Sequence, residues 1–470
     1  MDNFSHSMQK KLLDVAIIVL VMASLFFYSY WNPPFVLLIL FSIVFNYSWG
    51  RLVQHANIST IFFLAAGIAV NLILIGYFKY SNFFMKNMAN LLNHDWSTVN
   101  IFLPLGISFF TFQQIGYLVD CYKGKAKEHK FIHYALFVTF FPQLIAGPIV
   151  RYDEIMPQFT RLRTFGLSYR NLLMGIALLS MGLFKKVVIA DTFSPWVANV
   201  FDSPVQPTLI EAWGGALSYT FQIYFDFSGY TDMALGLAKL FNINLPINFN
   251  SPYKATSIID FWRRWHISLS LFFRDYLYIP LGGNKKGKLR QYMNILATMF
   301  LCGLWHGAAW TFIFWGVLHG AMACINHLWI DISQRLRIPP MPKLLGWALT
   351  FPSLVFAWVF FRADSFGRAC EICRGMLGLH GVYLPHHYVP LKIIRTFLEE
   401  NGIIFQYPDT WSFAGTPQIV AILIVFAISI FSVNSMTYLK NRINPYLVSF
   451  FMTYSVLSMH NVSEFLYFNF

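Results

Sequence analysis

The sequence predicts an all-α protein that crosses a membrane many times, and three observations support this prediction. Of the 470 residues, 57% are hydrophobic and only 12% are charged, whereas soluble domains carry roughly 25% charged residues. Apolar runs recur along the whole chain, and a helix needs about 20 such residues to cross a bilayer. Within these runs polar and apolar residues do not alternate, as they would in the strands of a membrane barrel.

The basic residues indicate how the chain is oriented. The net charge of +13 comes from short loops between the apolar runs, and membrane proteins keep such loops in the cytoplasm. Lys10 and Lys11 precede the first run, so we expect a cytoplasmic N-terminus. Nucleic-acid binding is not expected, because the sequence contains no soluble basic domain.

The first part of the chain is predicted to cross the membrane four times. The run from Leu12 to about Tyr30 is not followed by the small-residue cleavage site of a signal peptide, so we expect it to be a retained span. Basic residues after the second and fourth runs agree with loops on alternate sides of the membrane. The four expected spans cover residues 12–30, 34–50, 58–78 and 101–119.

The stretch from Phe131 to Arg163 departs from this pattern, because prolines and charged residues lie inside apolar sequence. Broken helices at membrane depth occur only where protein or a cavity covers the freed backbone, so we expect a re-entrant segment. Further apolar runs follow at residues 171–190, 213–227, 292–302, 311–330, 345–361, 419–433 and 447–458. Together they predict about 11 to 13 membrane elements in a single membrane-embedded domain of residues 1–470.

Residues 362–415 are the longest polar stretch and are expected to form a loop between membrane helices within that domain. The loop contains His380, His386 and His387, which could bind a metal ion. No carboxylate or cysteine cluster accompanies them, and zinc sites use such ligands. We therefore expect a solvated loop and no metal site.

The motif GLWHGAAW places His306 beside Trp305 in apolar sequence. An ionisable side chain at membrane depth is costly and points to a function. Burial disfavours the charged form of histidine, so His306 is expected to stay neutral and to accept a proton as a general base. Gly303 and Gly307 lack side chains, which we expect to let a substrate approach closely. The alternative is a histidine that joins two helices by a hydrogen bond, and two further histidines within residues 261–320 make this less favoured.

The segment FWRRWHISLSLFFRDYLYIPLGGN carries charged residues among apolar ones, namely Arg263, Arg264, Arg274 and Asp275. Arginine binds phosphates and carboxylates through paired hydrogen bonds, so these arginines could hold a phosphate-bearing donor at the cytoplasmic mouth of a site. They could equally pair with Asp260 and Asp275 or extend to the membrane surface, and the sequence leaves both possibilities open. His266 follows Arg263 by three positions on one helical face, which favours a substrate-positioning role.

Asp226 and Asp232 are carboxylates in the apolar segment FQIYFDFSGYTDMALG. They could orient a histidine or bind a cation. Such residues more often cap a helix or pair with an arginine, and we favour that interpretation. Asp226 is therefore a candidate supporting residue of the site.

These motifs resemble the membrane-bound O-acyltransferase family, in the bacterial branch that O-acetylates alginate or peptidoglycan or transfers D-alanine to teichoic acids. The resemblance rests on FWRRWHISLSLFFRDYLYIPLGGN and GLWHGAAWTFIFWGVLHG. It extends to LPLGISFFTFQQIGYLVDCYKG, FFPQLIAGPIVRYDEIMPQ and the terminal FLYFNF, and it covers nearly the whole chain after about residue 20.

The resemblance implies a ring of helices around a central funnel, with a narrow tunnel that joins the two membrane faces. His306 matches the active histidine of the family, and His266 matches its second important histidine. His319 matches a further recurring position whose role is open. Trp305 is expected to form a wall of the site.

By the same resemblance, the protein is expected to be an O-acyltransferase of the bacterial inner membrane. A cytoplasmic thioester donor, acetyl-CoA or another acyl thioester, would supply an acetyl group, and no bound cofactor is expected. The acceptor would be an extracytoplasmic polysaccharide, such as an alginate-like polymer, another exopolysaccharide or peptidoglycan, reached directly or through a periplasmic acetyltransferase partner. His306 would take the proton of the acceptor hydroxyl, which then attacks the thioester carbonyl.

Two alternatives stay open. A transporter or channel for an acyl carrier or a small molecule would also place histidines and broken helices in the membrane, although the sequence shows no repeated halves. Among enzymes, D-alanyl transfer or lipid O-acylation is the alternative. The LGGN segment resembles the alginate type more than the D-alanine type.

Overall fold

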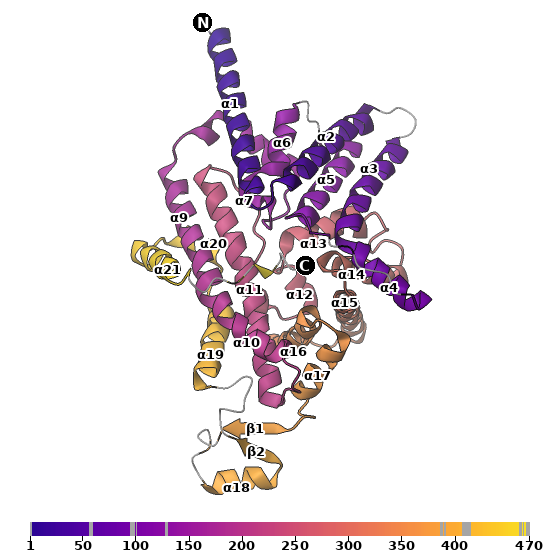
Figure 1. The fold of residues 1–470 in the computed structure, drawn as a ribbon, viewed down its shortest axis with the longest axis vertical. Coiled ribbons are helices and arrows are strands. Elements are labelled where there is room, and N and C mark those ends of the chain that lie inside the picture. Colours follow the sequence, from indigo (N-terminus) through magenta and orange to yellow (C-terminus); the bar gives the residue numbers. More distant parts are fainter. Residues whose placement is uncertain are drawn as a thin grey trace.

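The computed structural model describes residues 2–55, 60–94, 99, 101–126, 130–385, 389, 392–406, 415–459, 463 and 465–466. Within these residues the regular structure is helical apart from one parallel pair of strands, β1 (Val382–Pro385) and β2 (Ile403–Gln406) (Figure 1). The predicted all-α class is therefore confirmed.

Six helical stretches of the described residues are long and apolar enough to cross a membrane, namely Met8–Ser29, Pro34–His55, Thr60–Leu92, Tyr169–Phe201, Trp310–Leu336 and Lys343–Arg362. A bent pair, α19 (Thr416–Phe431) and α20 (Ser435–Asn441), would add a seventh span if it crosses as one unit. The other membrane elements expected from the sequence lie in shorter helices, in broken helices, or in long helices that are less apolar. Their total of about 11 to 13 stays a prediction.

The N-terminal part of the chain forms the upper bundle in Figure 1, in which α5 packs against α2 and α3, and α6 packs against α1. The stretch predicted to be re-entrant divides into short helices, most of whose residues are buried. The elements of this part are α1 (Asp2–Ser29), α2 (Pro34–His55), α3 (Thr60–Ile75), η1 (Gly76–Tyr80), α4 (Ser81–Leu92), α5 (Ile107–Tyr122), α6 (Phe131–Thr139), α7 (Phe141–Leu144), α8 (Tyr152–Phe159) and η2 (Leu162–Phe165).

Two long helical stretches run through the centre of the molecule. One is α11 (Leu209–Leu240), which extends well beyond the predicted run of residues 213–227 and begins with a capping box formed by Thr208 and Glu211. The other consists of α9 (Tyr169–Leu183), the π-helical turn η3 (Phe184–Ala190) and α10 (Asp191–Phe201). A Cβ atom on Gly182 would lie 2.5 Å from the carbonyl oxygen of Gly229. Small residues at this contact let the two backbones approach closely.

The segment with the candidate site is built from short and long helices in succession. Its elements are η4 (Pro252–Lys254), α12 (Ile258–Trp262), α13 (Ile267–Phe273), η5 (Arg274–Tyr278), α14 (Lys288–His306), α15 (Trp310–Leu336) and α16 (Lys343–Arg362). The helices α14 and α15 pack against each other as a hairpin with a short turn at residues 307–309. This hairpin places the end of α14 inside the protein.

The C-terminal part occupies the lower end and one side of the molecule (Figure 1). Residues 362–415, predicted to be a polar loop, contain α17 (Phe366–Met376), which packs against α11, followed by β1, α18 (Lys392–Glu400) and β2. After α19 and α20, α21 (Pro445–Leu457) packs against α9. His386 and His387 of the predicted loop lie outside the described residues.

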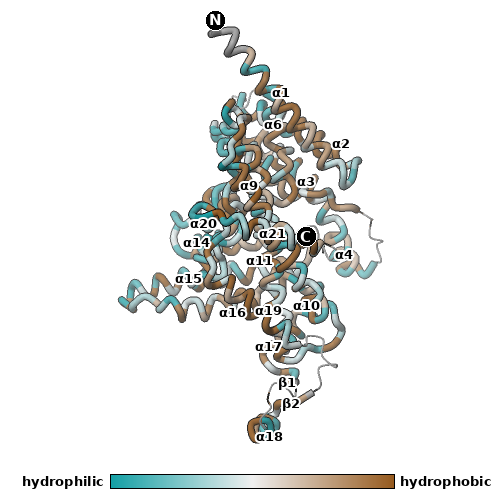
Figure 2. The backbone as a smooth tube through the Cα atoms, turned by 90° about the vertical axis from the view of Figure 1, so that its left-hand side faces the viewer, coloured by the Kyte–Doolittle hydropathy of each residue, from teal (hydrophilic) through white to brown (hydrophobic). Residues whose placement is uncertain are grey.

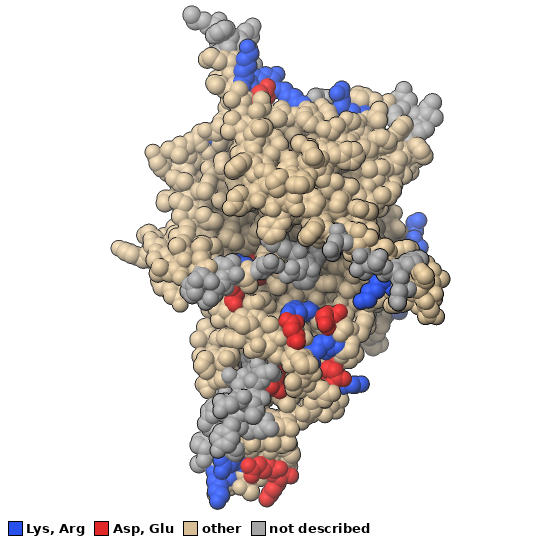
Figure 3. Space-filling view, viewed as in Figure 1, with Lys and Arg blue, Asp and Glu red and all other residues tan. Residues whose placement is uncertain are grey.

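Apolar side chains face outward along the long helices, as contact with lipid requires. Figure 2 shows hydrophobic residues along α1, α2 and α3, where Phe26, Leu37, Ile61 and Ile73 are each at least 69% exposed. In Figure 3 a broad surface without charged residues lies below a group of basic residues at the upper end. Soluble proteins do not expose apolar patches of this extent, so the protein is a multi-pass membrane protein.

Candidate active site

His306 is the last residue of α14, and its ring lies inside the protein. The chain leaves the helix at Gly307 in an extended conformation, and His306 is only 2% exposed. The ring packs edge-on against Trp315 and Phe361, with 5.2 Å between ring centroids in each case. The imidazole is therefore held away from the lipid-facing surface.

His306 lines a cavity of about 70 Å³ that we call the small cavity. Trp305 forms another wall, at the place the sequence predicts, and its Nε1 donates to the carbonyl oxygen of Ser108 at 3.4 Å. Lys79 and Ser108 also line it, and the remaining lining residues are Trp31, Leu103, Pro104, Leu105, Gly106, Ile107, Phe109, Ile145 and Ala146. The small cavity thus joins the end of α14 to the start of α5 and to the break after α7.

His266 begins α13 in a left-handed backbone conformation with φ 42° and ψ 54°, which non-glycine residues adopt only where their surroundings require it. Its Nδ1 lies 3.2 Å from Asn248 Oδ1, and the same oxygen accepts hydrogen bonds from the N–H and the hydroxyl of Ser268. Because a carbonyl oxygen only accepts, Nδ1 donates, and Nε2 is the acceptor nitrogen of the neutral ring. The ring centroids of His266 and His306 are 6.5 Å apart.

His319 lies on α15, and its ring contacts Trp315, which also contacts the ring of His306. Its ring centroid is 4.7 Å from that of Trp315 and 5.3 Å from that of Trp262. It is fully buried, and neither ring nitrogen has a hydrogen-bond partner among the described residues. The structure therefore brings His306, His266 and Trp305 together and separates His319 from the small cavity.

The expectation that two glycines open space for a substrate is wrong. A Cβ atom on Gly303 would lie 2.3 Å from the carbonyl oxygen of Phe312 and 3.1 Å from Gly316 Cα. A Cβ atom on Gly307 would lie 2.2 Å from the ring of Phe312. The space beside both glycines is filled by α15, so these residues allow close packing of α14 against α15.

Two of the three arginines pair with carboxylates, which is one of the possibilities that the sequence leaves open. Arg264 Nε donates to Asp260 Oδ1 at 2.8 Å, and Asp275 binds both Arg274, with 2.6 Å between Nε and Oδ1, and Arg151. Burial alone would raise the pKa of Asp275, but these two guanidinium groups hold that pKa below its ordinary value.

Arg263 and Arg274 line a second cavity of about 530 Å³, which we call the large cavity. Arg274 does so while paired with Asp275. Asn284, Gln291 and His327 add polar groups to its lining. Basic and amide side chains around a cavity of this size fit a ligand with anionic and polar parts.

The helix α14 connects the two cavities. Cys302 lines the large cavity and His306 lines the small one, and residues four apart lie on one face of a helix. His306 is therefore one helical turn from the large cavity. A continuous tunnel between the two membrane faces stays a prediction.

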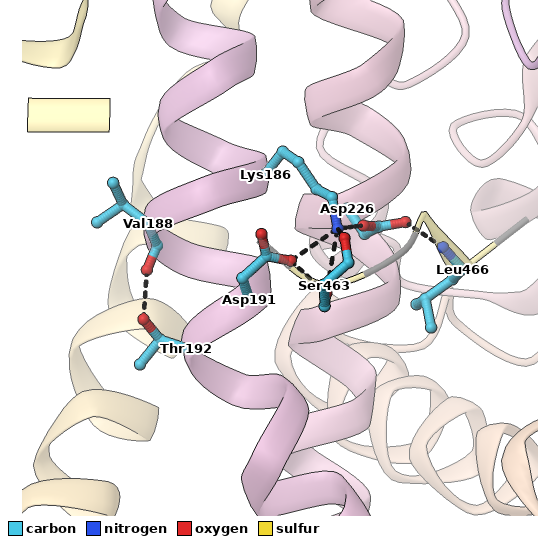
Figure 4. Close-up of polar contacts among 7 residues, drawn as sticks. All are labelled: Lys186, Val188, Asp191, Thr192, Asp226, Ser463 and Leu466. Atoms are coloured by element: carbon cyan, nitrogen blue, oxygen red, sulfur yellow. Dashed lines mark hydrogen bonds and ion pairs between the residues drawn. The ribbon is translucent and has the colours of Figure 1, made fainter. Parts of the chain in front are cut away.

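Asp226 lies in a buried ionic cluster (Figure 4). Lys186 of η3 places its Nζ 2.8 Å from Asp226 Oδ1 and 2.6 Å from Asp191 Oδ1. The Ser463 hydroxyl donates to Asp191 at 2.5 Å, and the Leu466 N–H donates to Asp226 at 3.2 Å. The ion-pair partner of Asp226 is thus a lysine, where the sequence favoured an arginine or a helix cap.

This ionic cluster holds the C-terminal segment beside the site. The ring of Phe465 stacks on Tyr230 with 4.5 Å between centroids and lies 6.2 Å from Phe227. Phe227 in turn contacts His266 edge-on at 4.7 Å. Asp226 therefore lines neither cavity. It is connected to His266 only indirectly, through the C-terminal segment and the ring of Phe227.

Sequence reasoning missed Lys79. The predicted third span ended at residue 78, which placed the lysine at an outer helix end, but the apolar helical stretch continues to Leu92. Lys79 Nζ donates to the carbonyl oxygens of Trp305 at 2.5 Å and His306 at 3.1 Å. A lysine among apolar residues in the middle of a long helical stretch is the signal that could have identified it.

Among the described residues, His, Cys, Asp and Glu side chains form no group that could hold a metal ion. The site consists of imidazole, indole, amino, guanidinium, amide and hydroxyl groups around two cavities. Such a set suits binding, charge stabilisation and proton transfer.

Together these features define a class, that of multi-pass membrane proteins with a buried histidine site between two cavities. Residues 54–363 match the family described as MBOAT, membrane-bound O-acyltransferase family. The match covers more than half of the chain, and the protein belongs to this family. It is an O-acyltransferase and uses an acyl donor.

Three relatives illustrate the range of the family. The chain is 42% identical to a "Peptidoglycan O-acetyltransferase" of Helicobacter pylori, over 96% of this chain and 91% of that protein. It is 40% identical to a "Probable alginate O-acetylase AlgI" of Pseudomonas aeruginosa, over 76% of this chain and 69% of that protein. A "Teichoic acid D-alanyltransferase" of Bacillus subtilis is 30% identical, over 57% of this chain and 70% of that protein.

Proposed function

We propose that the enzyme transfers an acetyl group from acetyl-CoA in the cytoplasm to hydroxyl groups of an extracytoplasmic polysaccharide, across the bacterial inner membrane. The names of the relatives support acetyl transfer to a cell-surface polymer. Peptidoglycan is the first acceptor to test, because the peptidoglycan relative aligns over 96% of this chain. An alginate-like or other exopolysaccharide is the next.

The position of His306 between the two cavities carries the proposal. Its ring lines the small cavity, and the large cavity ends one helical turn away at Cys302. A donor in the large cavity and an acceptor hydroxyl in the small one would meet at this histidine. A general base must lie within hydrogen-bond reach of the proton that it takes.

In the proposed reaction His306 takes the proton of the acceptor hydroxyl, and the oxygen attacks the thioester carbonyl carbon. A C–O bond forms, the C–S bond breaks, and the departing thiolate takes up a proton to become the free thiol. His266, whose ring centroid lies 6.5 Å from that of His306, would position the thioester carbonyl or the acceptor hydroxyl at this base. Trp305 excludes water, which would otherwise hydrolyse the activated acyl group.

The large cavity is the proposed donor site. Arg263 and Arg274 at its wall would bind the phosphate groups of acetyl-CoA, because guanidinium groups match phosphate oxygens in geometry and charge. Asn284 and Gln291 would hydrogen-bond to the amide groups of its pantetheine arm. No bound cofactor is needed, since the donor brings the reactive thioester.

A periplasmic acetyltransferase partner would carry the acetyl group from the membrane site to the polymer. A polymer chain is too large for a cavity of about 70 Å³, so a relay through a protein hydroxyl is consistent with the dimensions. Membership of an acyltransferase family removes the support for a transporter without covalent chemistry.

The test is mass spectrometry of cell-surface polymers in a deletion strain complemented with variants. Wild-type protein should restore the acetyl ester, and His306→Asn should lower it by about 10²-fold or more, as expected for loss of a general base. His55→Asn, an exposed histidine at the end of α2, is the matched control and should restore the ester fully. An unchanged set of polymer esters in the deletion strain would overturn the function, and full activity of His306→Asn would overturn the role of the base.

A further inference from the structure

Lys79 lies in a helical stretch that is long and apolar enough to span the membrane, yet its ammonium group points inward to the small cavity. A charged side chain in such a stretch is costly and needs compensation. Among the described residues the compensation comes from carbonyl oxygens, since the structure gives Lys79 no ion pair with a carboxylate.

A π-helical turn presents this lysine. The turn η1 links α3 to α4, and π-helical insertions occur frequently at functional sites because they break the regular spacing of side chains. Tyr80 from the same turn donates its hydroxyl to the carbonyl oxygen of Leu304 at 2.6 Å. Lys79 and Tyr80 therefore engage the carbonyls of Leu304, Trp305 and His306.

These three carbonyls belong to the last turn of α14, where the helix has no backbone partners for them. The partial negative charge of a helix C-terminus also favours a cation at this place. Lys79 thus fixes the backbone that carries His306 and compensates the charge at the end of the helix.

We propose that Lys79 is a positioning and electrostatic residue of acyl transfer, which holds His306 at the small cavity and places its amino group beside the reacting carbonyl, where a developing negative charge favours the ammonium form. The proposal rests on the proposed function. During attack on a thioester the carbonyl oxygen becomes negatively charged, and a preorganised cation at that point lowers the barrier. An ammonium has three N–H groups, and two serve the carbonyls of Trp305 and His306.

The third N–H group of Lys79 donates to Ser108 Oγ, which lines the small cavity, at a distance of 3.4 Å. This distance is long for a hydrogen bond from nitrogen to oxygen. A negatively charged oxygen in the small cavity would be a stronger acceptor than the hydroxyl.

Three substitutions of Lys79 distinguish the contribution of its charge from those of its hydrogen bonds and of its packing. Lys79→Arg keeps the charge, Lys79→Gln keeps an N–H donor without charge, and Lys79→Met keeps only the apolar stem. The assay measures ester formation by purified enzyme in lipid nanodiscs, with radiolabelled acetyl-CoA and the polymer that the deletion strain identifies. The periplasmic partner is added if wild-type transfer needs it.

We expect Lys79→Met and Lys79→Gln to lower kcat by about 10²- to 10³-fold, the range seen when one stabilising donor is removed from an oxyanion site, with the KM for acetyl-CoA within about twofold. Lys79→Arg should retain at least about a tenth of the wild-type kcat. Lys86→Met, which changes the charge of α4 outside the small cavity, is the matched control and should behave as wild type.

Wild-type kcat in Lys79→Met or Lys79→Gln would overturn the proposal. Equal loss in all three variants, together with lower unfolding temperatures, would also overturn it, because that result would indicate a purely structural lysine. Failure of the proposed function is distinguishable, since wild-type enzyme would then form no ester with acetyl-CoA.

Discussion

At the scale of single residues, Asn248 sets the hydrogen-bonding state of His266. Its Oδ1 accepts from the ring Nδ1 and from two groups of Ser268, so the imidazole is held in one tautomer. A histidine held in one tautomer always presents the same ring nitrogen to a substrate hydroxyl. The unproductive tautomer is then scarcely populated.

Replacing Asn248 by Ala should therefore lower kcat by about 10- to 100-fold, the range typical of residues that orient a functional histidine. Asn248→Asp keeps the acceptor oxygen and should stay within about tenfold of the wild type. Steady-state kinetics with saturating acetyl-CoA provide the measurement. Full activity of Asn248→Ala, with unchanged folding, would show that the tautomer of His266 does not matter.

Sequence motifs predicted the site residues that are neighbours in the chain. They missed contacts between residues that are distant in the sequence. Trp305 and His306 lie side by side in the chain and in the site. Lys79 reaches His306 across 227 positions of sequence. Such a contact depends on how whole helices pack, and neither periodicity nor spacing specifies it.

At the scale of elements, the described residues contain three π-helical turns, η1, η3 and η5. The first carries Lys79, the second carries Lys186, and the third carries Arg274. Each of these cations bonds to the site or to a buried cluster described above. Sequence periodicity predicted the helices but not these turns, because a single extra residue per turn scarcely changes an apolar pattern.

The contact of α14 with α15 depends on glycine at position 316. A Cβ atom there would lie 2.3 Å from the carbonyl oxygen of Met299 and 3.0 Å from Gly303 Cα. Gly316→Ala should lower the free energy of unfolding by about 1–3 kcal/mol, as expected for overpacking, and should displace His306.

The unfolding temperature in detergent, read from intrinsic tryptophan fluorescence, measures this effect. Gly367→Ala is the control, because the nearest neighbour of a Cβ atom there is Ser365 Oγ at 4.0 Å. If both variants unfolded at the wild-type temperature, the two helices would have room that the structure does not show.

At the scale of the whole molecule, composition and apolar runs predicted the class, and the long helices appear near the expected positions. The hydrogen bonds that hold the C-terminal segment against the central helices could not be predicted from composition or apolar runs. Lys186, Asp191 and Asp226 come from η3, α10 and α11, and they bind the segment that contains Ser463 and Leu466.

Lys186→Met should destabilise the protein by about 3–5 kcal/mol, because two buried carboxylates lose their cation. The C-terminal segment should become accessible, so a C-terminal tag should be cleaved faster in limited proteolysis. Lys440→Met, at an exposed position of α20, is the control. Equal cleavage of the tag in wild type and Lys186→Met would mean that packing of Phe465 alone secures the segment.

The hydrogen bonds from Lys79 and Tyr80 to the end of α14 also restrict which hybrids of this chain and a relative can be active. The two sides of this contact are encoded more than 200 positions apart, so a hybrid of two relatives with a junction anywhere between them receives its lysine from one parent and its histidine from the other. We expect such a hybrid to be active only when both parents place η1 and the end of α14 at the same distance in space. Swaps that keep both stretches from one parent avoid that mismatch.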